Sequence, residues 1–83
     1  MNFTEHVKIR EEKFGTVIFE TLKEKVFVTN EIGKHILDLL QKEKPVENII
    51  EILTDSYNAQ LETILKDVTI FISQLKDNNI LTQ

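Results

Sequence analysis

The segment Lys25-Val26-Phe27-Val28-Thr29 has the β-branched and aromatic composition that is typical of a strand. Because side chains alternate between the two faces of a strand, Val26 and Val28 are expected to fill a core while Phe27 points the other way. A strand with apolar side chains on both faces, at the edge of a sheet, could accept an incoming peptide as one more strand. The long helix expected over residues 61–75 could supply an apolar wall beside that edge.

Two further strands are predicted upstream of this segment. Residues 6–10 alternate polar and apolar side chains, and residues 16–20 are rich in β-branched and aromatic residues. Residues 11–14 are expected to form a charged connection between them. Residues 22–25 lie at hairpin distance between the second and third strands, so the third strand should run antiparallel to the second.

Three helices are predicted after the strands. Asn30 suits the N-cap of the first helix, and Pro45 suits the first turn of the second. Asn79 can end the third helix in the left-handed conformation, which lets Ile80-Leu81 fold back onto the core. Apolar residues recur at helical spacing in all three helices: Ile32, Ile36, Leu39 and Leu40; Val46, Ile49, Ile50, Leu53 and Tyr57; Leu61, Ile64, Leu65, Val68, Phe71, Ile72 and Leu75.

This order of elements predicts an α+β fold, a three-stranded antiparallel sheet followed by three helices that cover one face of the sheet. The layout is similar to a winged helix-turn-helix with the sheet placed first. We find no internal repeat or linker, so residues 1–83 are expected to form one domain with its core over residues 6–81. Residues 1–5 carry no pattern and are expected to be a lead-in ordered only by a neighbour.

The composition limits the chemistry that the chain can perform. With 83 residues, 41% of them hydrophobic and 29% charged, the chain has the make-up of an ordinary globular domain. It has no cysteine, and its imidazoles are His6 and His35, so no metal site or cofactor is expected. His35 lies at the margin of the first helix's apolar stripe and is expected to be structural. No segment approaches membrane-spanning length, and the expected location is the cytoplasm.

Catalysis and nucleic-acid binding are both disfavoured by the sequence. Gly15 and Gly33 are too far apart for a glycine-rich phosphate loop, and the neighbouring acids Glu11-Glu12 should point to opposite sides of an extended segment. Residues 30–58 carry six acids and three bases, with no base between residues 46 and 57. A helix that enters DNA needs lysine and arginine for phosphate contacts. The chain is therefore not expected to be an enzyme or to bind nucleic acid.

Several stretches, taken in order, resemble the PqqD-like family, the recognition elements (RREs) for precursors of ribosomally synthesised and post-translationally modified peptides (RiPPs). The family pattern V-Y/F-x-L-N leading into a helix appears as Val26-Phe27-Val28-Thr29-Asn30, followed by Glu31-Ile32-Gly33. The resemblance continues through Tyr57, Asp67-Val68, Leu75 and Ile80-Leu81, and so covers residues 7–81.

Three positions depart from the family pattern. Thr29 replaces a usual leucine, Lys42 and its neighbours replace a glycine between the first two helices, and Pro45 replaces a Ser/Thr cap. Thr29 is the departure that could alter the end of a peptide-binding strand.

The resemblance implies that the chain binds the leader of a precursor peptide as an antiparallel strand packed against the third helix. It also implies a separate modifying enzyme, such as a radical SAM maturase, a leader protease or a cyclase. The implied contact residues are Lys25, Val26, Phe27, Val28, Thr29, Ile64, Asp67, Val68, Phe71, Ile72 and Leu75. Part of this set must be core, and we expect Val68 to be core and Phe71 to contact the peptide more than Ile72.

Two other functions remain open from the sequence. The first is a winged-helix DNA-binding regulator, which the shortage of basic residues in the helices disfavours. The second is a small structural or oligomerisation subunit, because an open edge strand can pair with its own copy. The chain is accordingly expected to be a monomer or an edge-strand dimer.

Overall fold

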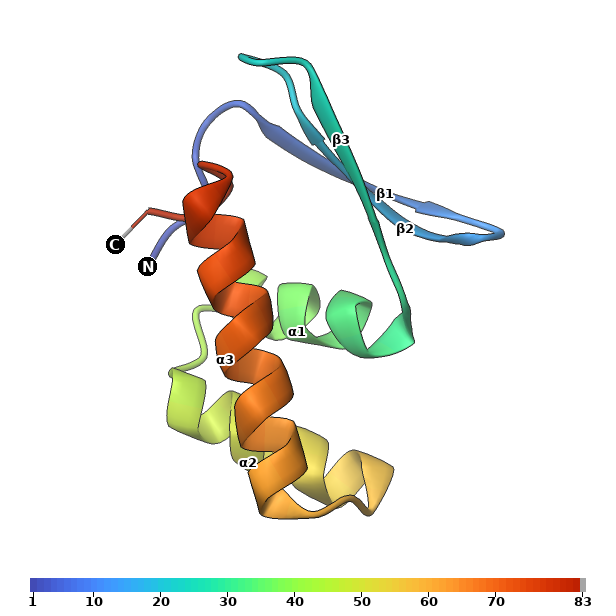
Figure 1. Ribbon diagram of the computed structural model, residues 1–83, viewed down its shortest axis with the longest axis vertical. Helices are drawn as coiled ribbons and strands as arrows, with labels where there is room; N and C mark the ends of the chain where they lie inside the picture. Colours follow the sequence, from blue (N-terminus) through green and yellow to red (C-terminus); the bar gives the residue numbers. More distant parts are fainter. Residues whose placement is uncertain (83) are drawn as a thin grey trace.

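The computed structural model describes residues 1–82 and places an antiparallel sheet against a layer of helices (Figure 1). The elements follow the predicted order: β1 (Val7–Glu12), β2 (Gly15–Glu20), β3 (Lys25–Thr29), α1 (Glu31–Gln41), α2 (Val46–Tyr57) and α3 (Leu61–Asp77). The strand order β1-β2-β3 leaves β3 at one edge of the sheet. The predicted α+β class is therefore confirmed.

The register of the sheet decides which face each side chain takes. Ile18 of β2 pairs with Ile9 of β1 and with Phe27 of β3, and all three belong to or pack against the hydrophobic core. Val26 and Val28 therefore lie on the opposite face, where they are 59% and 58% exposed. The prediction that these valines fill the core while Phe27 points away is wrong. The alternation of side chains along β3 allows either Phe27 or the two valines to face the core. The pairing of Phe27 with the buried Ile18 turns Phe27 toward the core.

The β1–β2 hairpin is tighter than predicted. Glu11 and Glu12 belong to β1 instead of the connection, because Glu12 pairs with Gly15 and leaves a short turn. Gly15 has a φ of +147°, and a Cβ atom there would lie 2.8 Å from the carbonyl oxygen of Thr29 on β3. Only glycine allows the backbones of β2 and β3 to approach this closely at that point.

The junction between β3 and α1 depends on a second close approach. Asn30 caps α1 as predicted, with its Oδ1 atom accepting a hydrogen bond from the Gly33 N–H at 3.0 Å. A Cβ atom on Gly33 would collide with the Thr29 Oγ1 atom and would lie 2.9 Å from the Thr29 Cβ and Cγ2 atoms. The missing side chain at Gly33 therefore lets the end of β3 rest directly on the first turn of α1.

The core lies between the inner face of the sheet and the helices. Leu37 is fully buried, although the apolar stripe predicted for α1 did not include it. The stripe was too narrow because α1 contacts β2, β3 and α2 and is covered on more than one side (Figure 1). The buried core residues are Ile18, Ile36, Leu37, Leu39, Leu40, Ile49, Leu53, Ile64, Val68, Ile72, Leu75, Ile80 and Leu81.

The buried stripe of α3 is narrower than predicted. Leu61 and Leu65 were assigned to it but are 58% and 47% exposed. Along the chain α3 packs mainly on α2, so residues at the margin of the stripe meet no second helix. Ile70, predicted to lie opposite the stripe, is 46% exposed as expected.

The C-terminal segment folds back as predicted. Asn79 has a φ of +59°, and the Ile80 N–H donates a hydrogen bond to the Leu75 carbonyl at 2.8 Å. Ile80 and Leu81 are only 1% and 4% exposed. The N-terminal segment, expected to lack order of its own, pairs with this fold-back, and the Thr4 N–H donates to the Ile80 carbonyl at 3.0 Å. A β-type pairing between the chain ends thus fixes the end of α3.

We predict that Gly33→Ala lowers the free energy of unfolding by about 1–3 kcal/mol, because the new methyl group overpacks the contact with Thr29. In a Thr29→Ala background the same substitution should cost less, since the colliding Oγ1 and Cγ2 atoms are gone. Urea unfolding of the two single variants and the double variant measures this coupling. Strictly additive effects would mean that the contact does not limit the junction.

Candidate functional site

The outer edge of β3 is unpaired. In the sheet, β3 has β2 as its neighbour on one side, and no other segment of residues 1–82 pairs with the other side. A strand edge of this kind presents backbone donors and acceptors that an extended chain can bind.

Hydrogen bonds of the first hairpin fix the direction of the backbone groups in β2. The Thr21 N–H donates to the His6 carbonyl at 2.9 Å, so the backbone groups of Thr21 point toward the β1 side. Backbone direction alternates along an antiparallel strand, and the groups of Glu20 therefore point toward β3. Since Glu20 pairs with Lys25, the N–H and C=O of Lys25 face β2.

The same alternation continues along β3. Lys25, Phe27 and Thr29 direct their backbone groups to β2, while Val26 and Val28 direct theirs to the free edge. The free edge of β3 therefore offers two N–H donors and two C=O acceptors, spaced as an antiparallel partner strand requires.

A cleft of about 170 Å³ runs between this edge and α3. Phe27 from β3 and Phe71 from α3 both line it, and Ile80 of the C-terminal fold-back lines it as well. Polar side chains accompany this apolar lining. The residues that line the cleft are Ile18, Phe27, Val28, Thr29, Phe71, Gln74, Leu75, Asn78 and Ile80.

The α3 wall of the cleft differs from the expected one. Phe71 is partly buried and lines the cleft, as expected, and Leu75 lines it while being 3% exposed. Ile64, Val68 and Ile72 are 2%, 0% and 6% exposed and belong to the core instead of the cleft. The expectation that Val68 is a core residue is confirmed.

Polar residues lie both before and after Phe71 along α3, and they differ in whether they line the cleft. Asp67 precedes Phe71 by one turn and is exposed, but it does not line the cleft. Gln74 and Asn78 do line it and were missed by sequence reasoning. Their spacing of three and seven residues from Phe71 places them on the same side of α3, and this spacing was the available signal.

The acidic pair on β1 is engaged in structural contacts. Glu11 and Glu12 point to opposite faces, as predicted. Glu11 pairs with Lys34 of α1 at 2.6 Å, and Glu12 pairs with Arg10 at 2.8 Å. The hydrogen bond and negative charge of Glu11 raise the pKa of Lys34 above its ordinary value. The Glu11–Lys34 pair joins β1 to α1, and the Glu12–Arg10 pair lies within β1.

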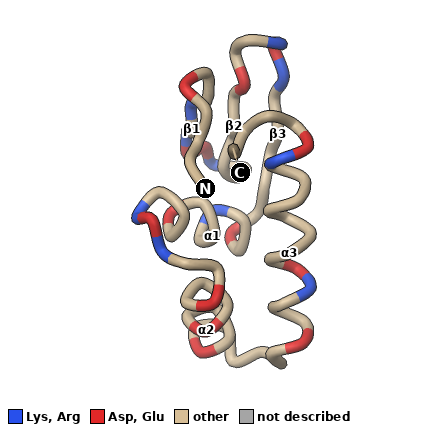
Figure 2. The backbone as a smooth tube through the Cα atoms, turned by 90° about the vertical axis from the view of Figure 1, so that its left-hand side faces the viewer, with Lys and Arg blue, Asp and Glu red and all other residues tan. Residues whose placement is uncertain are grey.

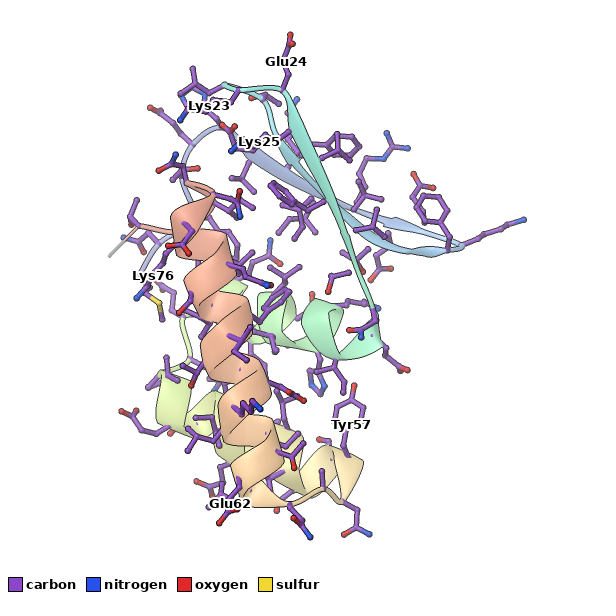
Figure 3. All side chains as sticks on the ribbon, in the orientation of Figure 1. Lys23, Glu24, Lys25, Tyr57, Glu62 and Lys76 are labelled. Atoms are coloured by element: carbon purple, nitrogen blue, oxygen red, sulfur yellow. The ribbon has the colours of Figure 1, made fainter. Side chains whose placement is uncertain are left out.

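His35 lies near Tyr57, and acidic residues outnumber basic ones in the three helices. His35 is partly buried, and its ring lies 6.0 Å from that of Tyr57, which extends from the end of α2 (Figure 3). No three His, Asp or Glu side chains within residues 1–82 are grouped to hold a metal ion. The acidic residues stand out along α2, which has no base (Figure 2). This charge disfavours the DNA-binding alternative.

No helix within residues 1–82 has both the length and the apolar character needed to cross a membrane.

Comparison with solved structures defines the class of fold. The chain matches TbiB1 in complex with the TbiA(β) leader peptide with a TM-score of 0.89 and 21% identity, over 98% of this chain and 94% of that one. It matches a lasso peptide synthetase B1 complexed with its leader peptide with a TM-score of 0.91 and 15% identity, over 99% and 96% of the two chains. The protein therefore has the fold of the RRE-type domains.

Sequence comparison identifies the family. The model for coenzyme PQQ synthesis protein D (PqqD) matches residues 5–81. A PqqA binding protein of Gluconobacter oxydans (strain 621H) is 31% identical over 81 residues, which cover 98% of this chain and 84% of that protein. The chain belongs to the PqqD family, as the resemblance in its sequence indicated.

We predict that Phe71→Ala costs less stability than Ile64→Ala, because Phe71 lines an open cleft and Ile64 is 2% exposed in the core. The loss for Ile64→Ala should be about 2–5 kcal/mol, and a fully buried Phe71 would cost about 3–5 kcal/mol. Thermal and urea unfolding of both variants give the comparison. A cost for Phe71→Ala equal to that of a core aromatic would place its ring in the core and remove it from the cleft wall.

Proposed function

We propose that this chain is a non-catalytic module that captures the leader of a ribosomally synthesised precursor peptide by strand addition to β3. In this role it delivers the rest of the precursor to a separate modifying enzyme. The observation that carries the proposal is the free edge at Val26 and Val28, whose outward backbone groups lie beside a cleft walled by Phe71.

The known relatives support a peptide as the ligand. The Gluconobacter protein, at 31% identity, is named for binding PqqA, and both structural matches are complexes with leader peptides. The site that this chain offers suits the same kind of guest, because strand addition uses main-chain groups that any extended peptide possesses.

The geometry divides affinity from selectivity. The backbone groups of Val26 and Val28 give register and affinity that depend little on the guest's sequence. Side chains on one face of the guest would enter the cleft between Phe27 and Phe71, where an apolar residue loses contact with water. Gln74 supplies a polar group at the rim, so a guest residue that reaches it should carry a hydrogen-bonding side chain.

Delivery to an enzyme follows from the size of the site. The free edge of β3 spans five residues, so it holds only a short part of a precursor and leaves the remainder unbound. A tethered substrate has a high effective concentration at an enzyme bound to the same module. The classes of enzyme that fit this role are a radical SAM maturase, a leader protease and a cyclase.

The direct test titrates the chain with a synthetic leader from the precursor gene nearest to its own gene, with PqqA of Gluconobacter oxydans as a second peptide. We expect saturable heat in calorimetry and NMR shifts in the amides of residues 25–29 and of Phe71. A scrambled leader of the same composition is the control. Absence of heat and of shifts at residues 25–29 with both peptides would contradict the proposal.

Val28→Pro tests the strand addition itself. The substitution removes an outward N–H without breaking a bond to β2, so the fold should remain while the guest loses a hydrogen bond worth about 1–3 kcal/mol. The matched control is Val7→Pro on β1, where the same alternation directs the amide to the opposite edge of the sheet. Calorimetry should find weaker leader binding in Val28→Pro and unchanged binding in Val7→Pro. Full affinity in Val28→Pro would rule out this register.

A further inference from the structure

The face of the sheet turned away from the helices has a repeated composition. One row across the strands is Arg10, Val17 and Val28, and the next row is Lys8, Phe19 and Val26. Each row thus runs from a base on β1, through a hydrophobic residue on β2, to an exposed valine on β3. We name these six residues the outer face. None of them belongs to the core cluster formed by the described residues.

The hydrophobic part of the outer face is open to solvent at Phe19, Val26 and Val28, whereas Val17 is only 4% exposed. Val26 and Val28 are more than half exposed, and Phe19 is only partly buried. The turns at both ends of the sheet expose large hydrophobic side chains as well, Phe14 at 71% and Leu22 at 66%. Phe19, Val26 and Val28 form an apolar strip, and such a strip on a small domain is typical of an interaction surface.

The charges of the sheet are divided between its two faces. Lys8 and Arg10 point outward, whereas Glu11 lies on the helix side and pairs with Lys34. Glu20 is 2% exposed on the helix side, and its carboxylate accepts hydrogen bonds from two backbone N–H groups of the β2–β3 turn at 3.0 Å.

The β1 side of the outer face therefore carries an excess of positive charge. Glu12, the acid next to these bases, is engaged by Arg10, and Lys8 has no ion-pair partner within residues 1–82. A second acid, Glu24, lies at the β2–β3 turn, where it lines a pocket with Phe19 and Val26. A partner that covers the apolar strip and places carboxylates opposite β1 would complement this face. A second copy placed face to face would offer Lys8 only Glu12, which Arg10 already engages, and Glu24 as acids.

A guest strand on β3 would widen the outer face. It would lie in the plane of the sheet, and alternate guest side chains would project on the same side as Val26 and Val28. Each row would then gain a fourth residue, supplied by the peptide. The leader's other side chains would occupy the cleft beside α3, on the opposite face.

We propose that the outer face is the docking surface for the modifying enzyme, which meets it with an apolar patch bordered by carboxylates. We infer further that the bound leader completes this surface. The inference rests on the proposed function, since the guest strand supplies part of the contact. Its consequence is positive coupling: the leader-loaded chain binds the enzyme more tightly than the empty chain does, and the enzyme tightens leader binding by the same factor.

The experiment uses the full chain, a synthetic leader from the adjacent precursor gene and the purified enzyme encoded beside it. Biolayer interferometry measures enzyme affinity with and without saturating leader, and fluorescence anisotropy measures leader affinity without enzyme. We expect the leader to raise enzyme affinity by about fivefold or more. Equal affinities with and without leader would overturn the composite surface.

Two substitutions on the outer face test the docking residues. Lys8→Glu reverses a charge on β1, and Phe19→Ser removes the central hydrophobic contact; each should weaken enzyme binding by about tenfold or more. Leader affinity without enzyme should be unchanged in both, which also verifies that they are folded. The controls are Lys66→Glu, which reverses the same charge, and Leu65→Ser, which also replaces a large hydrophobic side chain by serine; both lie at exposed positions of α3.

The possible results separate this inference from the proposed function. Full enzyme binding by Lys8→Glu and Phe19→Ser would overturn the docking surface and leave leader capture intact. Equal losses in the α3 controls would overturn it too, as would a dimer in sedimentation that Phe19→Ser dissociates. If the unmodified chain does not bind the leader, the proposed function is overturned. The inference that the bound leader completes the outer face is then overturned as well.

Discussion

The contact between Thr29 and Gly33 determines how the two layers of this protein are joined. A strand that ends against the first turn of a helix with no side chain in between can turn sharply, and the Asn30 cap satisfies the backbone at that turn. The turn places α1 beneath the sheet, where it contacts β2, β3 and α2. Because α1 is buried on several sides, the positions of α2 and α3 follow from it. Thr29, which departs from the family's usual leucine, is thus part of the joint.

The C-terminal fold-back provides the second constraint on the cleft. Ile80 follows a left-handed residue, inserts into the core and lines the cleft, while its carbonyl accepts a hydrogen bond from Thr4. The end of α3 is therefore held by both chain termini as well as by its own packing. A wall fixed in this way keeps Phe71 across the cleft from Phe27.

The order and type of the elements could be predicted because they depend on local signals. The β-branched and aromatic residues of β2, the Asn30 cap and the Asn79 helix end each act within a few residues, and the structure has all three. The facing of Val26 and Phe27 could not be predicted, because it depends on pairing with Ile18 on another strand. In a single strand with apolar residues at consecutive positions, either set of alternate side chains can face the core equally well.

The candidate site, too, could be predicted from the sequence only in part. The β3 edge and Phe71 could be found, since the first follows from strand order and the second from its place at the side of the α3 stripe. Assigning Ile72 to the core and Gln74 to the cleft required the tilt of α3, which is set by α2 and by the fold-back. Sequence periodicity gives relative angles around a helix, but it does not give the direction that faces a neighbouring element. Gln74 was also not predicted because the α3 side of the cleft was expected to be apolar.

The position of α3 also favours a single peptide strand over a second copy of the chain at the β3 edge. Two antiparallel edges are related by a two-fold axis perpendicular to the sheet, which keeps both helix layers on the same side. A second copy would therefore bring its own α3 to the side where this chain already has Phe71 and the cleft. A lone strand carries no such layer and fits between the edge and the helix. The wall that gives the cleft its selectivity thus also protects an otherwise open edge from self-pairing.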